Sequence, residues 1–285
     1  MKREKTSGRS RIRTLLFCLF TVLFLASAAY SAVKVYSNYK ADHAIRQLRS
    51  QIQDSRTAED SGALQSGSPA GTEKKGPSPA GETSGTEKAE PEAPRRLISM
   101  DFTPLLEINE ETVAWLSADG LSIDYPVLRA EDNDYYLNHM YNREVNSHGS
   151  LFVDYRNHGD FSDRNTFIYG HHMGDGSMFG CLDEYISPDF ISVVPTMMLR
   201  TPEGDYRIEL ICGTVEDGNE DFMEFNFETE EAFQNYVNTL RARSTFQSSV
   251  ELQPGDRLVS LCTCNYSQVN ARYMLVGRLV ELYEE

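Results

Sequence analysis

The pattern of apolar and polar positions divides the 285-residue chain into five segments. They are residues 1–13, 14–36, 37–53, 54–97 and 98–285. The second contains an uncharged, mainly apolar run from Thr14 to Val33, and about 20 such residues are long enough to cross a bilayer as a helix. The third has apolar side chains at helical spacing and predicts a short juxtamembrane helix. The fourth is mainly Ser, Gly, Pro, Ala, Thr, Glu and Lys, so it predicts a flexible linker before a folded domain.

The apolar run has two interpretations. Residues 1–13 contain six Lys or Arg and one acidic residue, and such a basic flank stays in the cytoplasm. An uncleaved signal anchor would then leave the N-terminus in the cytoplasm and the folded domain outside the cell. A cleavable signal peptide is the alternative, because Ala26-Ser27-Ala28 resembles a cleavage site. The run continues past that site and exceeds a usual signal core, which favours the anchor and a cell-membrane location.

Short apolar stretches bounded by turn residues dominate the folded domain. They predict strands at residues 121–127, 150–155, 165–169, 191–201, 205–215, 256–264 and 272–282. Pro126 predicts that the first of these strands occupies an edge or end position. Seven or eight short strands with few helices indicate a mainly β fold, either a barrel or a sandwich.

Two helices are predicted in the same domain. Asn109 resembles an N-cap, with Val113, Trp115 and Leu116 on the apolar side of the helix that would follow. Thr229 precedes a second helix, whose apolar side chains recur at positions i, i+3, i+4 and i+7. This second stripe predicts core packing and no cofactor site.

The last two predicted strands place a thiol beside a cation. If they pair as a hairpin, Cys264 ends one strand and Arg272 begins the other, with their Cβ atoms about 5 Å apart. A nearby cation lowers the pKa of a thiol and favours the nucleophilic thiolate. Cys262 shares the face of Cys264, because side chains alternate along a strand. The pattern therefore offers two candidate nucleophiles.

Charge excludes one class of partner. The net charge is −16, and residues 98–285 contain 11 Arg, no Lys and 33 Asp or Glu. A domain this acidic does not bind nucleic acid through phosphate contacts. Its surface is either simply well solvated or attractive to cationic substrates and amine nucleophiles.

Histidines in the domain provide candidate acid/base groups, and spacing alone does not separate a catalytic histidine from a structural one. They are His139, His148, His158, His171 and His172. His171 and His172 follow the predicted strand 165–169 and Gly170, and a rigid strand end is a common place for a catalytic group. Zinc is an alternative use of these histidines and the cysteines, but the Cys-x-x-Cys spacing of structural zinc sites is missing. A disulfide between Cys262 and Cys264 is disfavoured, because the Cα atoms of strand neighbours two apart lie about 6.5–7 Å from each other.

Several ordered motifs in residues 99–285 are similar to those of one family, the class B sortases. They are Asp101 to Asn109 with Val113 to Leu116, Ile123 to Val127, Asp132 to Leu137, Gly149 to Asn157, Asn165 to Met173, Asp175 to Phe179, Ser260 to Cys264, and Arg272. The long helix at 229–242 is also a feature of this class. Ser260 stands where the family usually has Thr, and His172 stands where Asn often follows the histidine.

The resemblance implies a membrane-anchored cysteine transpeptidase of Gram-positive bacteria with a closed β-barrel of seven to eight strands. In such an enzyme Cys264 is the nucleophile, His171 is the general acid and base, and Arg272 stabilises the oxyanion or aligns the substrate carbonyl. Sorting-signal contacts are expected at Asn133, Leu137, Tyr169 and Thr263. No metal or cofactor is implied.

The implied reaction is cleavage of a secreted protein's C-terminal sorting signal after Thr, through a thioacyl-enzyme. The acceptor would be a peptidoglycan-precursor amine or, in a pilin-polymerising enzyme, a pilin lysine. A membrane-anchored cysteine protease that uses water is the nearest alternative. A catalytically inactive adhesion or scaffold module is a further one, and the intact Cys, His and Arg set argues against it.

Overall fold

The computed structural model describes residues 5–63, 94–218, 222–265 and 271–284, which fall into two compact units, Met1–Leu48 and Arg49–Glu285. Helix α1 runs without interruption over Lys5–Ala63. Within the described residues, its segment Arg13–Val33 is long and apolar enough to cross a membrane. The helix continues through residues 37–53 and into residues 54–63, where a linker is predicted. The remaining linker residues up to 93 lie outside the described residues.

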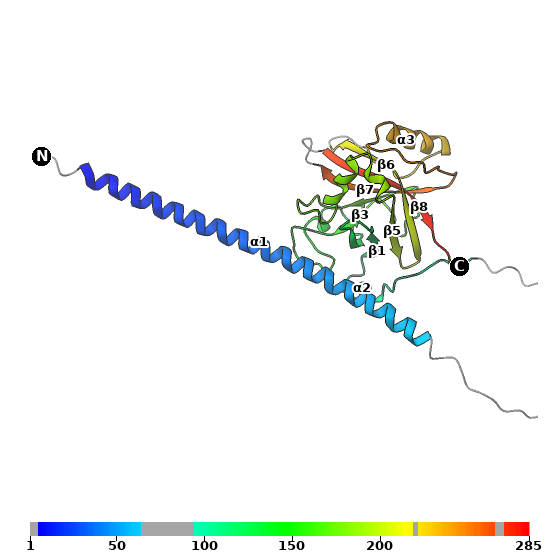
Figure 1. The fold of residues 1–285 in the computed structure, drawn as a ribbon, viewed down its shortest axis with the longest axis horizontal. Coiled ribbons are helices and arrows are strands. Elements are labelled where there is room, and N and C mark those ends of the chain that lie inside the picture. The colour runs from blue at the N-terminus through cyan, green and yellow to red at the C-terminus, as the bar shows by residue number, and fades with distance from the viewer. Residues whose placement is uncertain (1–4, 64–93, 219–221, 266–270, 285) are drawn as a thin grey trace, which may run out of the picture. The chain divides into compact units, whose positions relative to one another are not determined.

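Eight strands form a closed barrel (Figure 1). The strands are β1 (Thr112–Ser117), β2 (Asp124–Leu128), β3 (Leu151–Val153), β4 (Asn165–Tyr169), β5 (Thr196–Thr201), β6 (Gly204–Asp217), β7 (Arg257–Asn265) and β8 (Ala271–Glu281). Their order around the barrel is β1-β2-β3-β4-β7-β8-β6-β5. The mainly β fold and the closed barrel predicted from the sequence are confirmed.

Short helices precede the first strand or connect later strands. They are α2 (Thr103–Ile108), η1 (Tyr135–Leu137), η2 (Gly180–Ile186), η3 (Phe190–Ser192) and α3 (Glu230–Ala242). The longest of them, α3, begins where the sequence predicts, because the Thr229 side chain accepts a hydrogen bond from the Ala232 backbone N–H.

Most neighbouring strands are antiparallel, but β2 pairs with β3 and β4 pairs with β7 in parallel. In the second pair, Asn165 lies opposite Leu258 and Tyr169 lies opposite Cys262. A parallel pair brings the carboxyl ends of both strands to the same edge of the sheet. The residues that follow β4 therefore lie beside the end of β7.

The barrel wall has an apolar layer on each side. Side chains such as Val259, Leu261 and Leu275 point into the interior core. The alternate positions on β4, β7 and β8 point outward, and the apolar stripe of α3 covers part of them, including Phe167 and Met274. The stripe predicted at 233–240 therefore packs into a core, as expected.

The helix predicted after Asn109 is wrong. Residues Thr112–Ser117 are strand β1, paired with β2 and β5, and the helix is α2, which ends just before Asn109. The Asn109 side chain accepts a hydrogen bond from the Glu111 backbone N–H and donates to the Tyr141 carbonyl oxygen. It therefore stabilises the turn from α2 into β1. Pairing with two other strands outweighs the local signal for a helix.

Pro126 does not mark a barrel edge, because β2 has neighbours on both sides. It lies opposite Trp115 of β1, while the β2–β3 pairing begins one residue later, at Val127. The proline thus occupies the end of a ladder, where its missing N–H costs no hydrogen bond to β3.

Candidate active site

The strand register places the three predicted catalytic residues in one row. Tyr169 of β4 lies opposite Cys262 of β7, and the Gly170 N–H donates to the Cys262 carbonyl oxygen at 3.2 Å. Continuing this parallel register by two positions sets His171 level with Cys264. On the other side of β7, Cys264 pairs directly with Arg272 of β8. The backbone thus brings histidine, cysteine and arginine to the ends of three neighbouring strands.

His171 has a defined tautomer when it is neutral. Its Nε2 atom lies 2.7 Å from the carbonyl oxygen of Leu137. A carbonyl oxygen only accepts, so Nε2 carries the hydrogen. In the neutral ring, Nδ1 is then the basic nitrogen that can accept a proton. Leu137, predicted as a substrate contact, therefore also orients the histidine through its backbone.

The missing side chain of Gly149 leaves room for the Leu137 carbonyl group, which makes a testable prediction. Its φ of +58° is unfavourable for other residues, and an added Cβ would meet the carbonyl oxygens of Tyr136 and, at 2.8 Å, Leu137. We expect Gly149→Ala to lower the free energy of unfolding by about 2 kcal/mol. It should also lower kcat, because the hydrogen-bond partner of His171 must move. Urea unfolding and peptide-cleavage kinetics measure the two effects.

Gly255→Ala is the matched control. Gly255 also has a positive φ, +88°, but an added Cβ there would meet no atom within 4 Å. Its alanine variant should lose about 1 kcal/mol of stability and keep the kcat of the folded enzyme. Equal kcat values in the two variants would contradict the role assigned to Gly149.

Glu216 extends the row to a fourth strand and has no counterpart in the sequence prediction. Glu216 belongs to β6 and lies opposite Arg272 of β8, and its side chain is almost fully buried. One carboxylate oxygen, Oε2, accepts from Arg243 at 3.0 Å, and no hydrogen-bond partner of the other is found in the described part of the chain. Arg272 itself donates from Nη1 to the Ala271 carbonyl oxygen at 3.2 Å. The sequence alone does not predict that Glu216 lies beside Arg272, because their proximity depends on the pairing of β6 with β8.

Burial makes two other thiols of the domain poor nucleophiles. Burial raises the pKa of Cys212 to about 12, and it also raises the pKa of Cys181. Little of either group is thiolate at neutral pH. Cys262 is 1% exposed, and its outward-facing position lies under the α3 side of the barrel. Burial thus disfavours three of the four cysteines in the domain as nucleophiles.

The other histidines have local partners away from this row. His139 stacks on Tyr135, and His148 bonds to Asn146. His158 pairs with Asp163, and His172 Nε2 lies 2.7 Å from Asp183 Oδ2. Among the described residues, no group of three or more His, Cys, Asp or Glu side chains could hold a metal ion.

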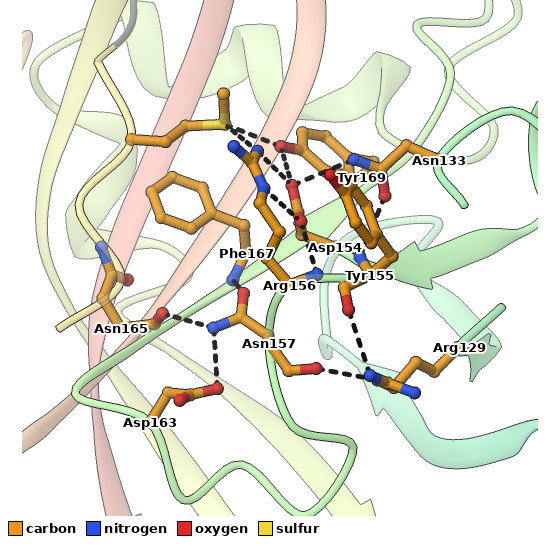
Figure 2. Close-up of polar contacts among 11 residues, drawn as sticks. Arg129, Asn133, Asp154, Tyr155, Arg156, Asn157, Asp163, Asn165, Phe167 and Tyr169 are labelled. Atoms are coloured by element: carbon orange, nitrogen blue, oxygen red, sulfur yellow. Dashed lines mark hydrogen bonds and ion pairs between the residues drawn. The ribbon is translucent and has the colours of Figure 1, made fainter. Parts of the chain in front are cut away.

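A buried carboxylate organises two of the predicted substrate contacts (Figure 2). Asp154 is fully buried, and its Oδ2 atom accepts from Tyr169 Oη at 2.8 Å and from Asn133 Nδ2 at 3.1 Å. Arg156 donates to both oxygens, from Nε at 2.9 Å and from Nη2 at 2.8 Å. Burial alone would raise the pKa of Asp154, but these hydrogen bonds outweigh it and the pKa lies below its ordinary value. The group is therefore a carboxylate at neutral pH.

The Thr263 side chain points into the barrel interior, whereas the side chains of Cys262 and Tyr169 lie on the outer side of the barrel wall. Thr263 pairs with Tyr273, whose ring belongs to the interior core, and its side chain is buried. Contact with a substrate would therefore have to come from the Thr263 backbone. Its role, like those of Asn133, Leu137 and Tyr169, stays a prediction.

Known proteins with a similar sequence and structure carry the same family name. A sortase B from Listeria monocytogenes is 37% identical over 180 residues, which are 62% of this chain and 72% of the relative. A sortase B from Staphylococcus aureus is 30% identical over 183 residues, or 64% of this chain and 75% of the relative. The solved Staphylococcus aureus sortase B–substrate complex aligns with a TM-score of 0.60 at 30% identity, covering 63% of this chain and 84% of that one. No protein-family model matches the chain.

Proposed function

The chain belongs to the class B sortases and is a cysteine transpeptidase, and from that premise we propose that it cleaves a sorting signal after Thr and transfers the protein to a cell-wall amine. The observation that carries this proposal is the backbone row formed by His171, two residues after the end of β4, Cys264 of β7 and Arg272 of β8. Such a row brings together the acid/base group, the thiol and the cation that acyl transfer requires.

Each residue has one role in the proposed reaction. The Cys264 thiolate attacks the carbonyl carbon of the Thr residue and forms a tetrahedral intermediate, whose oxyanion Arg272 stabilises. Protonated His171 gives its proton to the leaving amine, so the peptide bond breaks and a thioester remains. The incoming amine then attacks the thioester, His171 removes its proton, and Cys264 leaves as the thiolate.

The proposed location follows from the N-terminal helix. The apolar segment Arg13–Val33 would act as a single-pass anchor, and the basic residues before it would stay in the cytoplasm. The catalytic domain would then lie outside the cell, where secreted clients and wall precursors are present. A solved relative holds a substrate, which supports a sorting-signal peptide as the first substrate.

An amine acceptor distinguishes transfer from hydrolysis. The full-length protein in detergent is mixed with fluorogenic peptides that carry a Thr–Gly or Thr–Asn bond, with and without a short glycine peptide. We expect mass spectrometry to find the amide adduct as the main product when the amine is present. The reason is that an amine is a much better nucleophile than water toward a thioester.

Free acid as the only product at every amine concentration would contradict the proposed transfer and favour an anchored protease. A product formed only with a pilin lysine peptide would assign the pilin-polymerising reaction. A Cys264→Ala sample with the same peptides controls for contaminating proteases.

A further inference from the structure

Asn133 and Tyr169 meet at one atom, although 36 positions separate them in the sequence. Both bond to Oδ2 of Asp154, so the two side chains are neighbours, and both are only half-buried. Figure 2 shows the dashed contacts of both residues converging on the Asp154 carboxylate. Tyr169 also lies opposite Cys262, two residues before the proposed nucleophile. The pair is therefore close to the reacting row.

Asp154 fixes which hydrogen-bonding group each neighbour presents. An ionised carboxylate can only accept, so the Tyr169 hydroxyl donates its single hydrogen to Asp154. Burial, with the nearby Asp154 charge, raises the pKa of Tyr169, which keeps the phenol protonated. The Tyr169 oxygen can then offer only lone pairs to a further partner. Met223 Sδ, 2.8 Å away, has no hydrogen to give it.

The Asn133 amide is fixed in the same way. Its Nδ2 donates to Asp154, and its Oδ1 accepts from the Tyr155 backbone N–H at 3.1 Å. This leaves one N–H of Nδ2 without a partner in the part of the chain that the structure describes. Asn133 thus presents a donor beside the acceptor of Tyr169.

Asp154 is itself held rigidly. Arg156 grips the carboxylate with Nε, Nη2 and its backbone N–H, and the guanidinium lies over the Phe225 ring, 4.4 Å from its centroid. The Asp154 backbone N–H donates to the Phe167 carbonyl oxygen at 3.0 Å, just beyond the end of β3. A fixed hub of this kind can hold two partners in one orientation, which lowers the cost of ordering them on binding.

We propose that Asp154 is a positioning residue that sets Asn133 as a donor and Tyr169 as an acceptor, so that together they bind one backbone amide of the sorting-signal peptide. A peptide bond offers one N–H and one C=O, which complement this pair. The inference rests on the proposed function, because the peptide is the substrate assigned there. Asp154 would then contribute to substrate recognition through Asn133 and Tyr169 and take no part in the chemistry.

The first test is Asp154→Asn in the full-length protein, with the peptide that the wild-type enzyme cleaves fastest. A carboxamide of the same size can donate as well as accept, so it no longer dictates the hydrogen-bonding roles of its neighbours. We expect KM to rise about tenfold or more and the alkylation rate of Cys264 by iodoacetamide to change less than about twofold. KM within about twofold of the wild-type value would overturn the inference.

Asp163→Asn is the matched control. Asp163 is also buried and accepts from Asn157 Nδ2 at 2.9 Å and from the His158 N–H at 2.7 Å, but no contact joins it to Asn133 or Tyr169. It should lose stability and keep KM. Equal KM increases in both variants would show a general structural effect and overturn the inference. Should Asp154→Asn not fold, Arg156→Gln loosens the same carboxylate, and an unchanged KM in that variant would also overturn it.

A second test uses the substrate. Peptides methylated at one backbone nitrogen at a time lose that N–H, and one of them should lower kcat/KM of the wild-type enzyme about tenfold or more. In Tyr169→Phe the acceptor is already missing, so the same methyl group should cost less than about twofold. An equal loss in both enzymes would overturn the pairing. If the wild-type enzyme cleaves no peptide at all, the proposed function fails, whereas normal cleavage without these effects refutes only the role of Asp154.

Discussion

Replacing Cys264 with Ala should lower the rate of sorting-signal cleavage by about 10⁴-fold or more, to background. In the proposed reaction the Cys264 thiolate forms the covalent intermediate, and the domain's other cysteines that the structure describes are buried or half-buried. Cleavage of the fluorogenic peptide measures the loss, and mass spectrometry should detect a thioacyl adduct in the wild-type protein alone.

Cys262→Ser is the matched variant, since it removes a thiol from the same strand two residues earlier. Cys262 is buried and lies opposite Tyr169 and Met274, so the hydroxyl should fit and most of the activity should persist. If both variants lost activity to the same degree, the assignment of the nucleophile to Cys264 would be wrong.

Replacing His171 with Ala should lower kcat by about 10²–10⁴-fold, the usual contribution of a positioned acid/base group. The imidazole is oriented by the Leu137 carbonyl oxygen and lies level with Cys264 in the register of β4 and β7. Steady-state kinetics with the fluorogenic peptide measure the loss.

The neighbouring histidine provides the comparison. His172 pairs with Asp183, outside the row, and His172→Asn keeps a polar side chain of similar reach. We expect this variant to retain most of kcat while losing some thermal stability. A His172→Asn enzyme as inactive as His171→Ala would transfer the acid/base role to His172.

Much of the barrel could be predicted because its strands carry their own local signals. β4 has the bounds predicted for it, since the apolar residues that end the segment 165–169 are followed directly by Gly170. The last two strands pair as predicted and bring Cys264 opposite Arg272. In both cases, neighbouring residues alone contain the information.

The error at β1 has a different origin. The apolar pattern of Val113, Trp115 and Leu116 fits one side of a helix, but it also fits a strand that is paired on both sides. An asparagine such as Asn109 is common both at helix caps and in turns. Contacts with Tyr125 and Leu199, both across from Leu116, decide between them, and these partners are 9 and 83 positions away.

Asp154 and Glu216 could not be assigned roles from the sequence for a related reason. A single acid at the end of an apolar run resembles an ordinary strand terminus. The role of each acid depends on partners that only the fold brings near. The partners of Asp154 are 21 positions before it and 15 positions after it, and the partner of Glu216 lies on the adjacent strand.

The parallel pairing of β4 with β7 also determines when the enzyme becomes active during its own synthesis. His171 is synthesised long before Cys264, and β7 must pair with β4 before the two residues lie level with each other. Contacts between such distant parts of a chain form late in folding. While the chain is still being synthesised, the backbones of His171, Cys264 and Arg272 therefore cannot yet lie in one row, and the proposed site is complete only once the last two strands have joined the barrel.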